Sequence, residues 1–504
     1  MQALCRLEDV PDGAARGLLR RGNDDQVFVL RQGDTARVWL NDCPHNHRPL
    51  EYRQDQFLSA DGLHIVCYAH SAHFDRHSGY CFAGPCEGRS LVPVPSRIEA
   101  GVVWIATELP TVLTERETAM FQYFPTNYVW SLSTMIALTH GGNIGEVDAM
   151  CAPILEAARA GDDIGTHAFF DTWKGGGDQL IALADTDLAK GHTLSAGEKL
   201  GRAALYYCIA ERMQAHGFEA RLATYQRSLE LFAQARSLAR ENCERVEIPY
   251  EGKHLAGLLV RAENTNGPAP IVLVMNGLDS TKEMLQKSVM GTMFARRGLS
   301  ALFIDQPGTG EALRLHGMPA VHNTEVWASK TVDWLVQQPY VDPRRIGALG
   351  VSLGGYYCPR AVAFEPRFAC GAVWGANHDW REVQQARLKR EGENPVPHYW
   401  KHVQWVFGAT DIDDFFKKAE AMHLNGVLEN IRVPFLVTHG ENDRQIPLKY
   451  AHQTFAQLVN SPKKDLMIFD KSTGGVEHSS LDNPNNAGNQ IADWLAEQLG
   501  GTTA

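Results

Sequence analysis

The chain has 504 residues, which is too long for one ordinary hydrophobic core and predicts two or three domains. Its composition, with 44% hydrophobic and 21% charged residues, is typical of a soluble globular protein. The formal net charge of −11 and the lack of a basic stripe argue against a nucleic-acid partner, because such proteins need a cationic face to displace counterions.

No segment of the sequence predicts a signal peptide or a membrane span. Residues 1–17 contain Arg6, Glu8, Asp9, Asp12 and Arg16, which leaves no apolar core for a signal peptide. The ten cysteines are scattered, so we expect thiols or metal ligands in a reducing compartment rather than a disulfide framework. These patterns predict a cytoplasmic protein with no membrane partner.

Short alternating strands separated by turn residues occupy the chain from about Val27 to Thr107. The clearest are VFVLRQGDTARVWLND, HIVCYA and GVVWIATE. Alternation of apolar and polar residues over such short runs predicts a small antiparallel all-β domain, which we assign to residues 1–112.

Two loops of this β domain each combine a cysteine with a histidine. Cys43 and His45 are separated by one residue, and Cys67 and His70 by two. A Rieske [2Fe-2S] centre needs two thiolates on one iron and two imidazoles on the other, so these four residues are the predicted cluster ligands. Two cysteines with two histidines are also a common ligand set for zinc, which is the alternative.

The sequences around the four ligands, CPHNHRPL and CYAHSAHFD, with Gly84-Pro85 downstream, resemble Rieske ferredoxins and the Rieske domains of ring oxygenases. Ser71 stands where that family usually has glycine, and the gap between the loops is somewhat long. Neither loop has the second cysteine of respiratory Rieske proteins. The resemblance therefore implies a ferredoxin-like centre of lower potential, with Cys81 and Cys86 as ordinary thiols.

Between about Thr118 and Asn242 the sequence pattern changes from short alternating strands to helical runs. Helical runs such as EVDAMCAPILEAARAGDD and SAGEKLGRAALYYCIAERMQAHG are separated by Gly or Asp-Asp stops. This pattern predicts an α-helical middle domain, over residues 113–245.

After Arg245, a hairpin-like segment, VEIPYEGKHLAGLLVRAE, precedes apolar strands that alternate with helical segments. The strands are APIVLVMNG, LSALFIDQPG, RIGALGVS, RVPFLVTHG and DLMIFD. Strand followed by helix, repeated, predicts a mostly parallel sheet with helices on both faces, over residues 246–504.

The strand RIGALGVS leads into the pattern G-x-S-x-G, with Ser352 between Gly350 and Gly354. A sharp strand-to-helix turn holds such a serine in a strained conformation, and the glycines on either side avoid a clash. Two later strand ends supply Asp443 and His478 in the order Ser, acid, His. We therefore predict a triad in which Asp443 orients His478 and His478 takes the proton of Ser352.

An oxyanion hole requires two backbone N–H groups aimed at the developing negative oxygen. Leu353 follows the predicted nucleophile, and Leu278 lies in the loop after IVLVM, where Gly277 allows a close backbone approach. The alternative is that Ser352 is only a helix N-cap and His478 a surface histidine. Their order with Asp443 favours the catalytic interpretation.

Three further motifs carry a second resemblance: GLDSTKE (residues 277–283), DQPGTGE (305–311) and GVSLGG, behind a helical domain containing Trp173 and Tyr206-Tyr207. Over roughly residues 118–500 the chain resembles the 2,6-dihydroxypseudooxynicotine hydrolase family and its polyketide-shortening relatives. The resemblance implies an α/β-hydrolase fold with a helical cap, a homodimer, and hydrolysis of a C–C bond next to a ketone in an aryl or β-dicarbonyl substrate. It also implies an additional carboxylate, for which Asp379 and Glu382 are the candidates.

Other members of the wider superfamily cleave esters, so a carboxylesterase with the same triad is an alternative. A second alternative is an electron carrier for a separate oxygenase, fused to a product-processing hydrolase. A self-contained oxygenase needs iron held by two histidines and a carboxylate, and His140, His167 and His192 lack that family's DxxHxxxxH spacing.

The intact triad favours a serine hydrolase that acts on a small-molecule substrate. The fused [2Fe-2S] cluster then has a structural, regulatory or electron-transfer role, with a reductase or oxygenase as the candidate redox partner.

Overall fold

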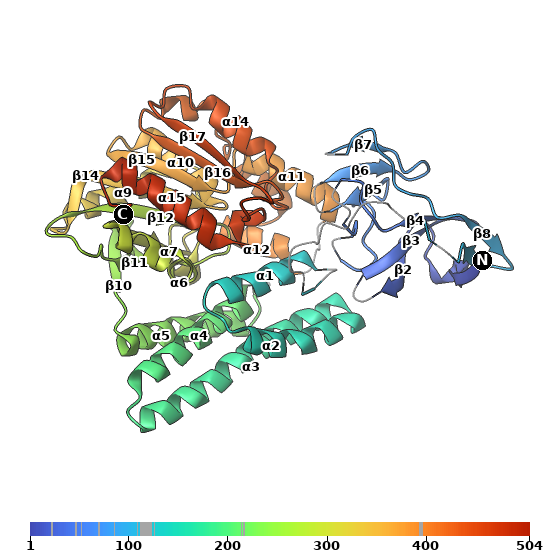
Figure 1. Ribbon diagram of the computed structural model, residues 1–504, viewed down its shortest axis with the longest axis horizontal. Helices are drawn as coiled ribbons and strands as arrows, with labels where there is room; N and C mark the ends of the chain where they lie inside the picture. Colours follow the sequence, from blue (N-terminus) through green and yellow to red (C-terminus); the bar gives the residue numbers. More distant parts are fainter. Residues whose placement is uncertain are drawn as a thin grey trace. The chain divides into compact units, whose positions relative to one another are not determined.

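The computed structural model describes residues 1–21, 24–45, 48–51, 53–68, 71–84, 86–107, 109–110, 123–124, 127–212, 214, 217–392 and 397–503. The chain folds into two compact units, and Figure 1 labels their elements. Unit 1 comprises Met1–Ser133 together with Gln384–Pro395, and unit 2 comprises Thr134–Val383 together with Val396–Ala504.

Unit 1 contains three small antiparallel sheets, each with three strands, so the predicted antiparallel β domain is confirmed. The sheets are β1 (Gln2–Arg6) with β9 (Val102–Ile105) and β8 (Ser96–Glu99); β2 (Ala15–Arg21) with β3 (Asp24–Gln32) and β4 (Thr35–Leu40); and β5 (His64–Cys67) with β6 (Ala72–Asp75) and β7 (Cys81–Ala83).

In strand β3 the apolar residues Val27–Leu30 follow one another without alternating polar residues. Both faces of the strand are buried. Phe28 belongs to one core cluster, which also contains Cys43 and Cys67, and its ring stacks on Phe57 with ring centroids 4.4 Å apart. Val27 points to the opposite face and joins a second cluster, as expected for neighbouring residues of a strand. The two predicted cluster-binding loops therefore begin from one packed core.

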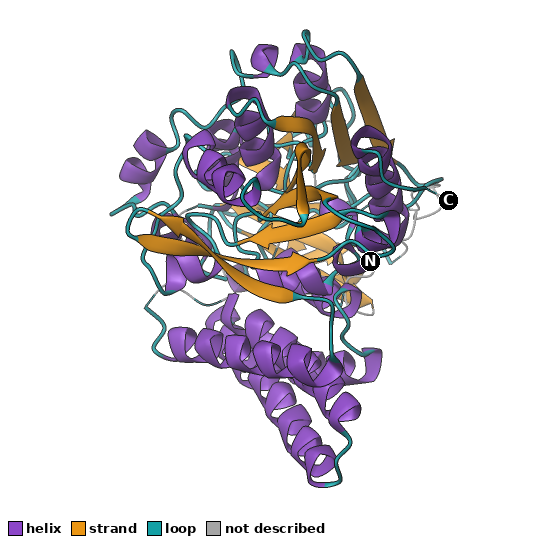
Figure 2. Ribbon diagram, turned by 90° about the vertical axis from the view of Figure 1, so that its left-hand side faces the viewer, coloured by secondary structure: helices purple, strands orange, loops and turns teal. Residues whose placement is uncertain are grey.

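The helical region predicted for the middle of the chain is confirmed. Its elements are α1 (Tyr128–Thr139), α2 (Ile144–Ala157), η2 (Ala158–Ala160), α3 (Asp162–Ala189), α4 (Thr193–Arg212) and α5 (Ala220–Ala239). Helix α4 packs against both α3 and α5, which explains why its residues from Ala203 to Arg212 are all buried. In Figure 2 helices α2–α5 form a layered group in the lower part of the picture, next to the large sheet of unit 2.

The large sheet has eight strands in the order β10-β11-β13-β12-β14-β15-β16-β17. The predicted hairpin is formed by β10 and β11, which pair antiparallel; β11 pairs antiparallel with β13, and all later pairs are parallel. The strands are β10 (Glu244–Tyr250), β11 (Lys253–Val260), β12 (Ala269–Met275), β13 (Ser300–Ile304), β14 (Val341–Val351), β15 (Phe368–Trp374), β16 (Phe435–Gly440) and β17 (Lys464–Phe469).

Helices cover both faces of this sheet (Figure 2). In the described part of the chain, the α-helices that follow β12 are α6 (Lys282–Lys287), α7 (Met290–Met293), α8 (Gly310–Arg314), α9 (Glu325–Leu335), α10 (Gly354–Phe364), α11 (Trp380–Glu391), α12 (Tyr399–Val406), α13 (Ile412–Lys418), α14 (Lys449–Gln457) and α15 (Pro484–Leu499). On β14, a Cβ added at Gly347 would meet Leu499 of α15, whereas one added at Gly350 would meet Gly354 and Cys358 of α10. The two glycines thus let helices pack closely on opposite faces of the central strand.

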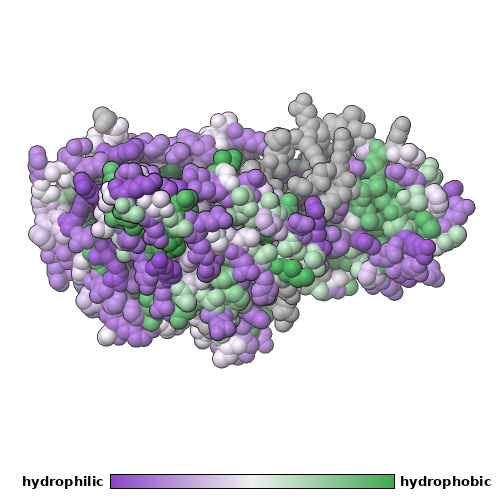
Figure 3. All heavy atoms as spheres, turned by 90° about the horizontal axis from the view of Figure 1, so that it is seen from below, coloured by the Kyte–Doolittle hydropathy of each residue, from purple (hydrophilic) through white to green (hydrophobic). Residues whose placement is uncertain are grey.

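Hydrophilic residues cover most of the face seen in Figure 3, and apolar residues form separate patches on it. Among the helices in the described part of the chain, none combines the length and apolar character needed to cross a membrane.

Candidate functional site

Ser352 lies at the sharp turn between β14 and α10, as the G-x-S-x-G pattern predicts. Its φ of 58° is in the left-handed region, which costs a non-glycine residue about 1–3 kcal/mol and persists only where the surroundings enforce it. A Cβ at Gly350 would come within 1.9 Å of the Gly354 carbonyl oxygen, so the turn requires glycine at that position. The backbone N–H of Ser352 donates to Trp374 on the neighbouring strand β15, which fixes the turn to the sheet.

The three residues predicted as a triad are brought together at one edge of the sheet. The hydroxyl of Ser352 is 2.8 Å from Nε2 of His478, and Nδ1 of His478 is 2.8 Å from Oδ2 of Asp443. Ser352 follows β14, Asp443 follows β16, and His478 begins the short helix η5 (His478–Ser480) after β17. With Nδ1–H donating to Asp443, Nε2 is the acceptor that can remove the serine proton.

Asp443 is buried and firmly held. Its Oδ1 accepts hydrogen bonds from the backbone N–H groups of Gln445 at 2.7 Å and Ile446 at 3.0 Å. Burial by itself would raise the pKa of this carboxyl, but attraction to His478 and the hydrogen bond from it outweigh that effect and lower the pKa. Asp443 is therefore ionised at neutral pH and can stabilise a protonated His478.

The two predicted oxyanion donors flank Ser352. Leu353 follows it directly, and Leu278 follows Gly277, where an added Cβ would lie 3.0 Å from the Ser352 Cβ. Within the described residues, neither backbone N–H donates to another group of the protein. Two unused N–H groups beside a nucleophile are the arrangement that an oxyanion hole requires.

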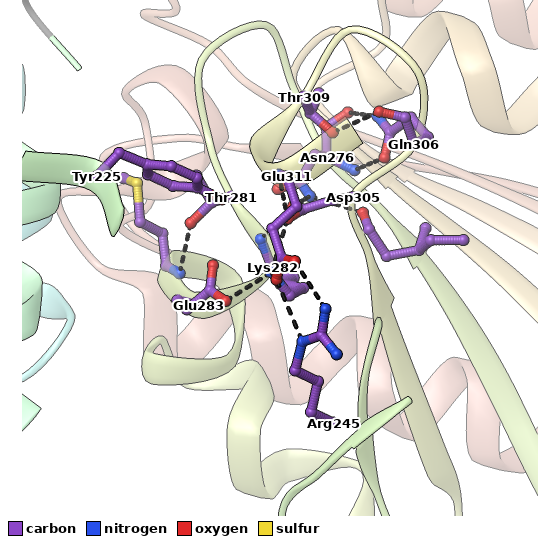
Figure 4. Close-up of polar contacts among 12 residues, drawn as sticks. Tyr225, Arg245, Asn276, Thr281, Lys282, Glu283, Asp305, Gln306, Thr309 and Glu311 are labelled. Atoms are coloured by element: carbon purple, nitrogen blue, oxygen red, sulfur yellow. Dashed lines mark hydrogen bonds and ion pairs between the residues drawn. The ribbon is translucent and has the colours of Figure 1, made fainter. Parts of the chain in front are cut away.

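A buried lysine joins the two loops that carry the GLDSTKE and DQPGTGE motifs (Figure 4). Nζ of Lys282 lies 2.8 Å from Asp305, 2.7 Å from Glu311 and 2.7 Å from Glu283, and the lysine side chain is fully buried. Burial, which by itself would raise the pKa of Glu311, is outweighed by Lys282 and Arg245, so this pKa is lowered to about 2. These contacts tie the GLDSTKE loop, which contains the predicted oxyanion donor Leu278, to the DQPGTGE loop.

A second buried network links the helical region to the sheet. Glu211 on α4 accepts hydrogen bonds from Nε of Arg221 at 2.6 Å and from Nε and Nη2 of Arg314, each at 2.9 Å. Nη2 of Arg221 also donates to Nδ1 of His402 on α12 at 3.1 Å. Burial, followed by the charges of Arg221, Arg314 and Arg212, holds the pKa of His402 well below its usual value, so this imidazole is neutral.

Neither network residue Glu211 nor His402 was predicted from the sequence. For Glu211 the sequence signal is a charged residue directly after the apolar run YYCIA. Such a residue almost always has a buried partner, but the sequence cannot identify the partner.

The two carboxylates proposed as catalytic assistants have other partners. Oδ1 of Asp379 accepts the backbone N–H of Glu382 at 2.8 Å, at the start of α11. Glu382 forms an ion pair with Lys449 at 2.7 Å, and its side chain is about half exposed. Neither carboxylate forms a hydrogen bond with Ser352 or His478 in the described structure.

The predicted cluster ligands in unit 1 are partly described. Cys43 and Cys67 are both buried in the same core, and the Cys67 thiol is the main cause that raises the pKa of Cys43, followed by Cys86 and burial. Burial, and then Arg89 and Arg48, lower the pKa of His45, which favours the neutral imidazole. The fourth predicted ligand, His70, lies outside the described residues.

Two adjacent thiols and a neutral imidazole fit the donor set of a Rieske centre, which they would hold with Cys43 and Cys67 on one iron and His45 on the other. In the described part of the chain, no three His, Cys, Asp or Glu side chains surround a single ion position. Cys86 lies beside this set, with its Sγ 3.4 Å from that of Cys81, so both expected thiols are buried next to the ligands.

Comparison with known protein families gives three matches. Residues 1–102 match the Rieske [2Fe-2S] domain, residues 180–377 match the esterase FrsA-like family, and residues 292–502 match the prolyl oligopeptidase family.

The similar proteins include two hydrolases. The chain is 29% identical over 360 residues to 2,6-dihydropseudooxynicotine hydrolase from Paenarthrobacter nicotinovorans, an alignment that covers 69% of this chain and 90% of that protein. It is 25% identical over 430 residues to hydrolase acrC from Aspergillus aculeatus, covering 75% of this chain and 98% of that protein. The crystal structure of 2,6-dihydroxy-pseudo-oxynicotine hydrolase matches with a TM-score of 0.59 and 25% identity, over 72% of this chain and 95% of that chain.

These matches confirm the expected multidomain architecture and the hydrolase class. The protein thus joins a Rieske [2Fe-2S] domain at its N-terminus to an α/β-hydrolase that is homologous to 2,6-dihydropseudooxynicotine hydrolase.

Proposed function

We propose that the protein hydrolyses a carbon–carbon bond next to a ketone in a small molecule of the β-diketone or acyl-arene class, with Ser352 as nucleophile. The observation that carries this proposal is the pair of 2.8 Å contacts that link Ser352 to His478 and His478 to Asp443. The choice of bond is the one that the resemblance to the 2,6-dihydroxypseudooxynicotine hydrolase family implies, and the alignment with 2,6-dihydropseudooxynicotine hydrolase, which covers 90% of that protein, supports this choice.

The site contains the groups for each step. His478 takes the hydroxyl proton as Oγ of Ser352 attacks the ketone carbon, and the N–H groups of Leu278 and Leu353 hold the resulting oxyanion. When the tetrahedral intermediate collapses, the bond to the neighbouring carbon breaks and its electron pair stays on that carbon, which is an enolate carbon or a ring carbon. His478 returns the proton to that carbon, which gives the ketone or the arene. Water, deprotonated by His478, then releases the acyl group from Ser352 as a carboxylate.

Product analysis tests this proposal. With a β-diketone or an acyl-arene we expect one carboxylic acid and one ketone or arene, both detected by mass spectrometry, and in H₂¹⁸O one labelled oxygen in the acid. The Ser352→Ala protein is the control and should give neither product. If only esters are turned over, yielding acid and alcohol, the protein is a carboxylesterase with the same triad, a function that the esterase FrsA-like match favours.

The proposed [2Fe-2S] cluster supplies no step of this hydrolysis, which involves no net redox change. A structural, regulatory or electron-transfer role is therefore proposed for it; a reductase or oxygenase partner and a homodimer stay predictions. A self-contained oxygenase is not proposed, because His140, His167 and His192 lack the DxxHxxxxH spacing of that family.

Substitution of one thiolate ligand tests the cluster. We expect the unaltered protein to be reddish-brown and to show a rhombic electron paramagnetic resonance signal when reduced, and Cys67→Ser to lose both. Cys5→Ser, which alters a partly exposed thiol of the same unit, is the matched control and should keep them. A colourless protein with stoichiometric zinc would contradict the assignment.

A further inference from the structure

The loop that contains the predicted oxyanion donor Leu278 is held at its base by its own side chains. Oγ of Ser280 donates to Oδ1 of Asn276 at 2.8 Å and accepts the backbone N–H of Gly277 at 3.0 Å. These hydrogen bonds join the two ends of the segment and leave out Leu278 and Asp279, which form the tip of the loop between them. The position of the tip therefore depends on a further contact.

Helix α4 of the helical region supplies that contact. Nη2 of Arg212, the last residue of α4, donates to Oδ2 of Asp279 at 2.5 Å, and no other hydrogen bond to this carboxylate occurs among the described residues. The side chain of Arg212 is 3% exposed and that of Asp279 is 30% exposed, so water and salt screen this ion pair less than a surface pair. Because Asp279 follows Leu278 directly, the ion pair lies one residue from the N–H that is expected to hold the oxyanion.

The end of α4 is itself fixed to the rest of unit 2. Glu211, the residue before Arg212, is 1% exposed and accepts hydrogen bonds from Arg221 and from Arg314. Arg314 ends α8, which begins inside the DQPGTGE motif. Two consecutive residues of α4 thus bind the segments that carry the two motifs, Glu211 through α8 and Arg212 through the oxyanion loop. The guanidinium of Arg212 therefore starts from a well-anchored point.

The two oxyanion donors differ in how their positions are set. Leu353 follows the nucleophile Ser352 directly, so the chain itself fixes the distance between them. Leu278 belongs to a separate loop, and its distance from Ser352 depends on how that loop is held. A donor is effective only about 2.7–3.1 Å from the position that the oxyanion will occupy, so a small displacement of the tip weakens the stabilisation of the transition state.

We propose that Arg212 is a positioning residue of the active site, which sets the position of the Leu278 N–H through its ion pair with Asp279. The proposal rests on the proposed function, in which Ser352 is the nucleophile, and holds whether a C–C bond or an ester is cleaved. Arg212 acts through the loop and needs no contact with the substrate. Through this residue the helical region contributes to the stabilisation of the transition state.

The test measures how fast a fluorophosphonate modifies the full-length protein, which requires no knowledge of the natural substrate. Oγ of Ser352 forms a bond to phosphorus, His478 takes the hydroxyl proton, fluoride leaves, and the phosphonyl oxygen occupies the oxyanion hole. Mass spectrometry follows the reaction to its end point. The end point gives the fraction of competent protein, so the second-order rate constant refers to correctly folded molecules alone.

Arg212→Met should lower this rate constant at least about tenfold, which is less than the about 10²- to 10³-fold loss expected when an oxyanion donor is removed outright. Arg212→Lys, which keeps a cation beside Asp279, should keep most of the rate. With the substrate that product analysis identifies, Arg212→Met should lower kcat and leave KM nearly unchanged, because the interaction is made in the transition state.

Arg297→Met is the matched control. Arg297 pairs with Asp493 at 2.5 Å, and the two side chains are 16% and 43% exposed. It precedes β13, whereas Ser352 follows β14, and both strands run parallel to β12, so Arg297 lies at the opposite edge of the sheet from the nucleophile. This substitution removes an arginine–aspartate pair of the same length and should leave the rate constant unchanged.

Asp279→Asn removes the charge from the partly exposed partner and keeps its shape, so it tests the ion pair even if Arg212→Met folds poorly. It should lower the rate constant at least about threefold, which is the loss of part of one donor's effect. Because both residues act through one contact, the double variant Arg212→Met with Asp279→Asn should be no slower than Arg212→Met by more than about twofold.

An unchanged rate constant in either Arg212→Met or Asp279→Asn would overturn the proposal, and so would an equal fall in Arg297→Met or losses that multiply in the double variant. A smaller competent fraction that reacts at the unaltered rate would show structural support alone and would also overturn it. Labelling that persists in Ser352→Ala would instead contradict the proposed function itself, which separates the two failures.

Discussion

Ser352→Ala is expected to lower kcat by about 10⁴- to 10⁶-fold for every substrate that the protein turns over. The reason is that the Ser352 hydroxyl is the only group placed 2.8 Å from Nε2 of His478 among the described hydrogen bonds, so no other nucleophile can take over. The measurement is initial rate at saturating substrate. The visible spectrum should not change, because the predicted cluster ligands belong to unit 1 and Ser352 to unit 2.

Ser195→Ala is the matched control for this experiment. Ser195 is exposed on α4, and its loss should leave kcat within about twofold, as for most surface substitutions. Residual turnover of Ser352→Ala within about a hundredfold of the unaltered protein would argue that His478 activates water directly and that no acyl-enzyme forms.

The second large effect concerns stability. Glu211→Gln should lower the free energy of unfolding by about 3–5 kcal/mol, because it removes the carboxylate that bridges two buried arginines, Arg221 and Arg314. Both guanidinium groups are at most 4% exposed and would be left close together without the carboxylate that bridges them. Urea denaturation followed by tryptophan fluorescence measures the change.

Glu230→Gln on the neighbouring helix α5 is the control with the same chemical change. Glu230 pairs with Arg227 at 2.8 Å, but the two side chains are 65% and 44% exposed. Pairs of this kind contribute about 0–1 kcal/mol, so the control should be nearly neutral. Equal destabilisation by the two substitutions would show that the Glu211 network does not hold the helical region to the sheet.

Much of the fold could be predicted because it depends on local patterns. The apolar runs of β12, β13, β14, β16 and β17 are rich in Val, Ile, Leu and Phe and stand out from their surroundings. Strand β15 was missed, although it lies beside the nucleophile turn. Its sequence, FACGAVW, has Cys, Gly and Ala where a strand usually has β-branched residues, and it forms because β14 and β16 pair on either side of it.

In the candidate site, too, some features follow from local sequence patterns and others depend on tertiary packing. Ser352, Asp443 and His478 each follow a strand of a parallel sheet, and the carboxyl ends of such strands meet at one edge, so their proximity could be predicted. The partners of Glu211 could not, because Arg314 is 103 residues away and the choice between buried arginines depends on tertiary packing. Asp379 and Glu382 were placed near the site by sequence position alone, and their side chains bond elsewhere.

Unit 1 is built from two segments that lie far apart in the sequence, and this affects the order in which its parts can fold during synthesis on the ribosome. The last strand of its β domain, β9, ends at Ile105, but Gln384–Pro395 emerge only after most of the hydrolase has been translated. At about 5–20 residues per second this interval is roughly 15 to 60 s. During that time Tyr68 and Ser71 lack the hydrogen bonds that Arg390 makes with them in the folded protein, so this part of unit 1 is completed only when the catalytic part is nearly translated.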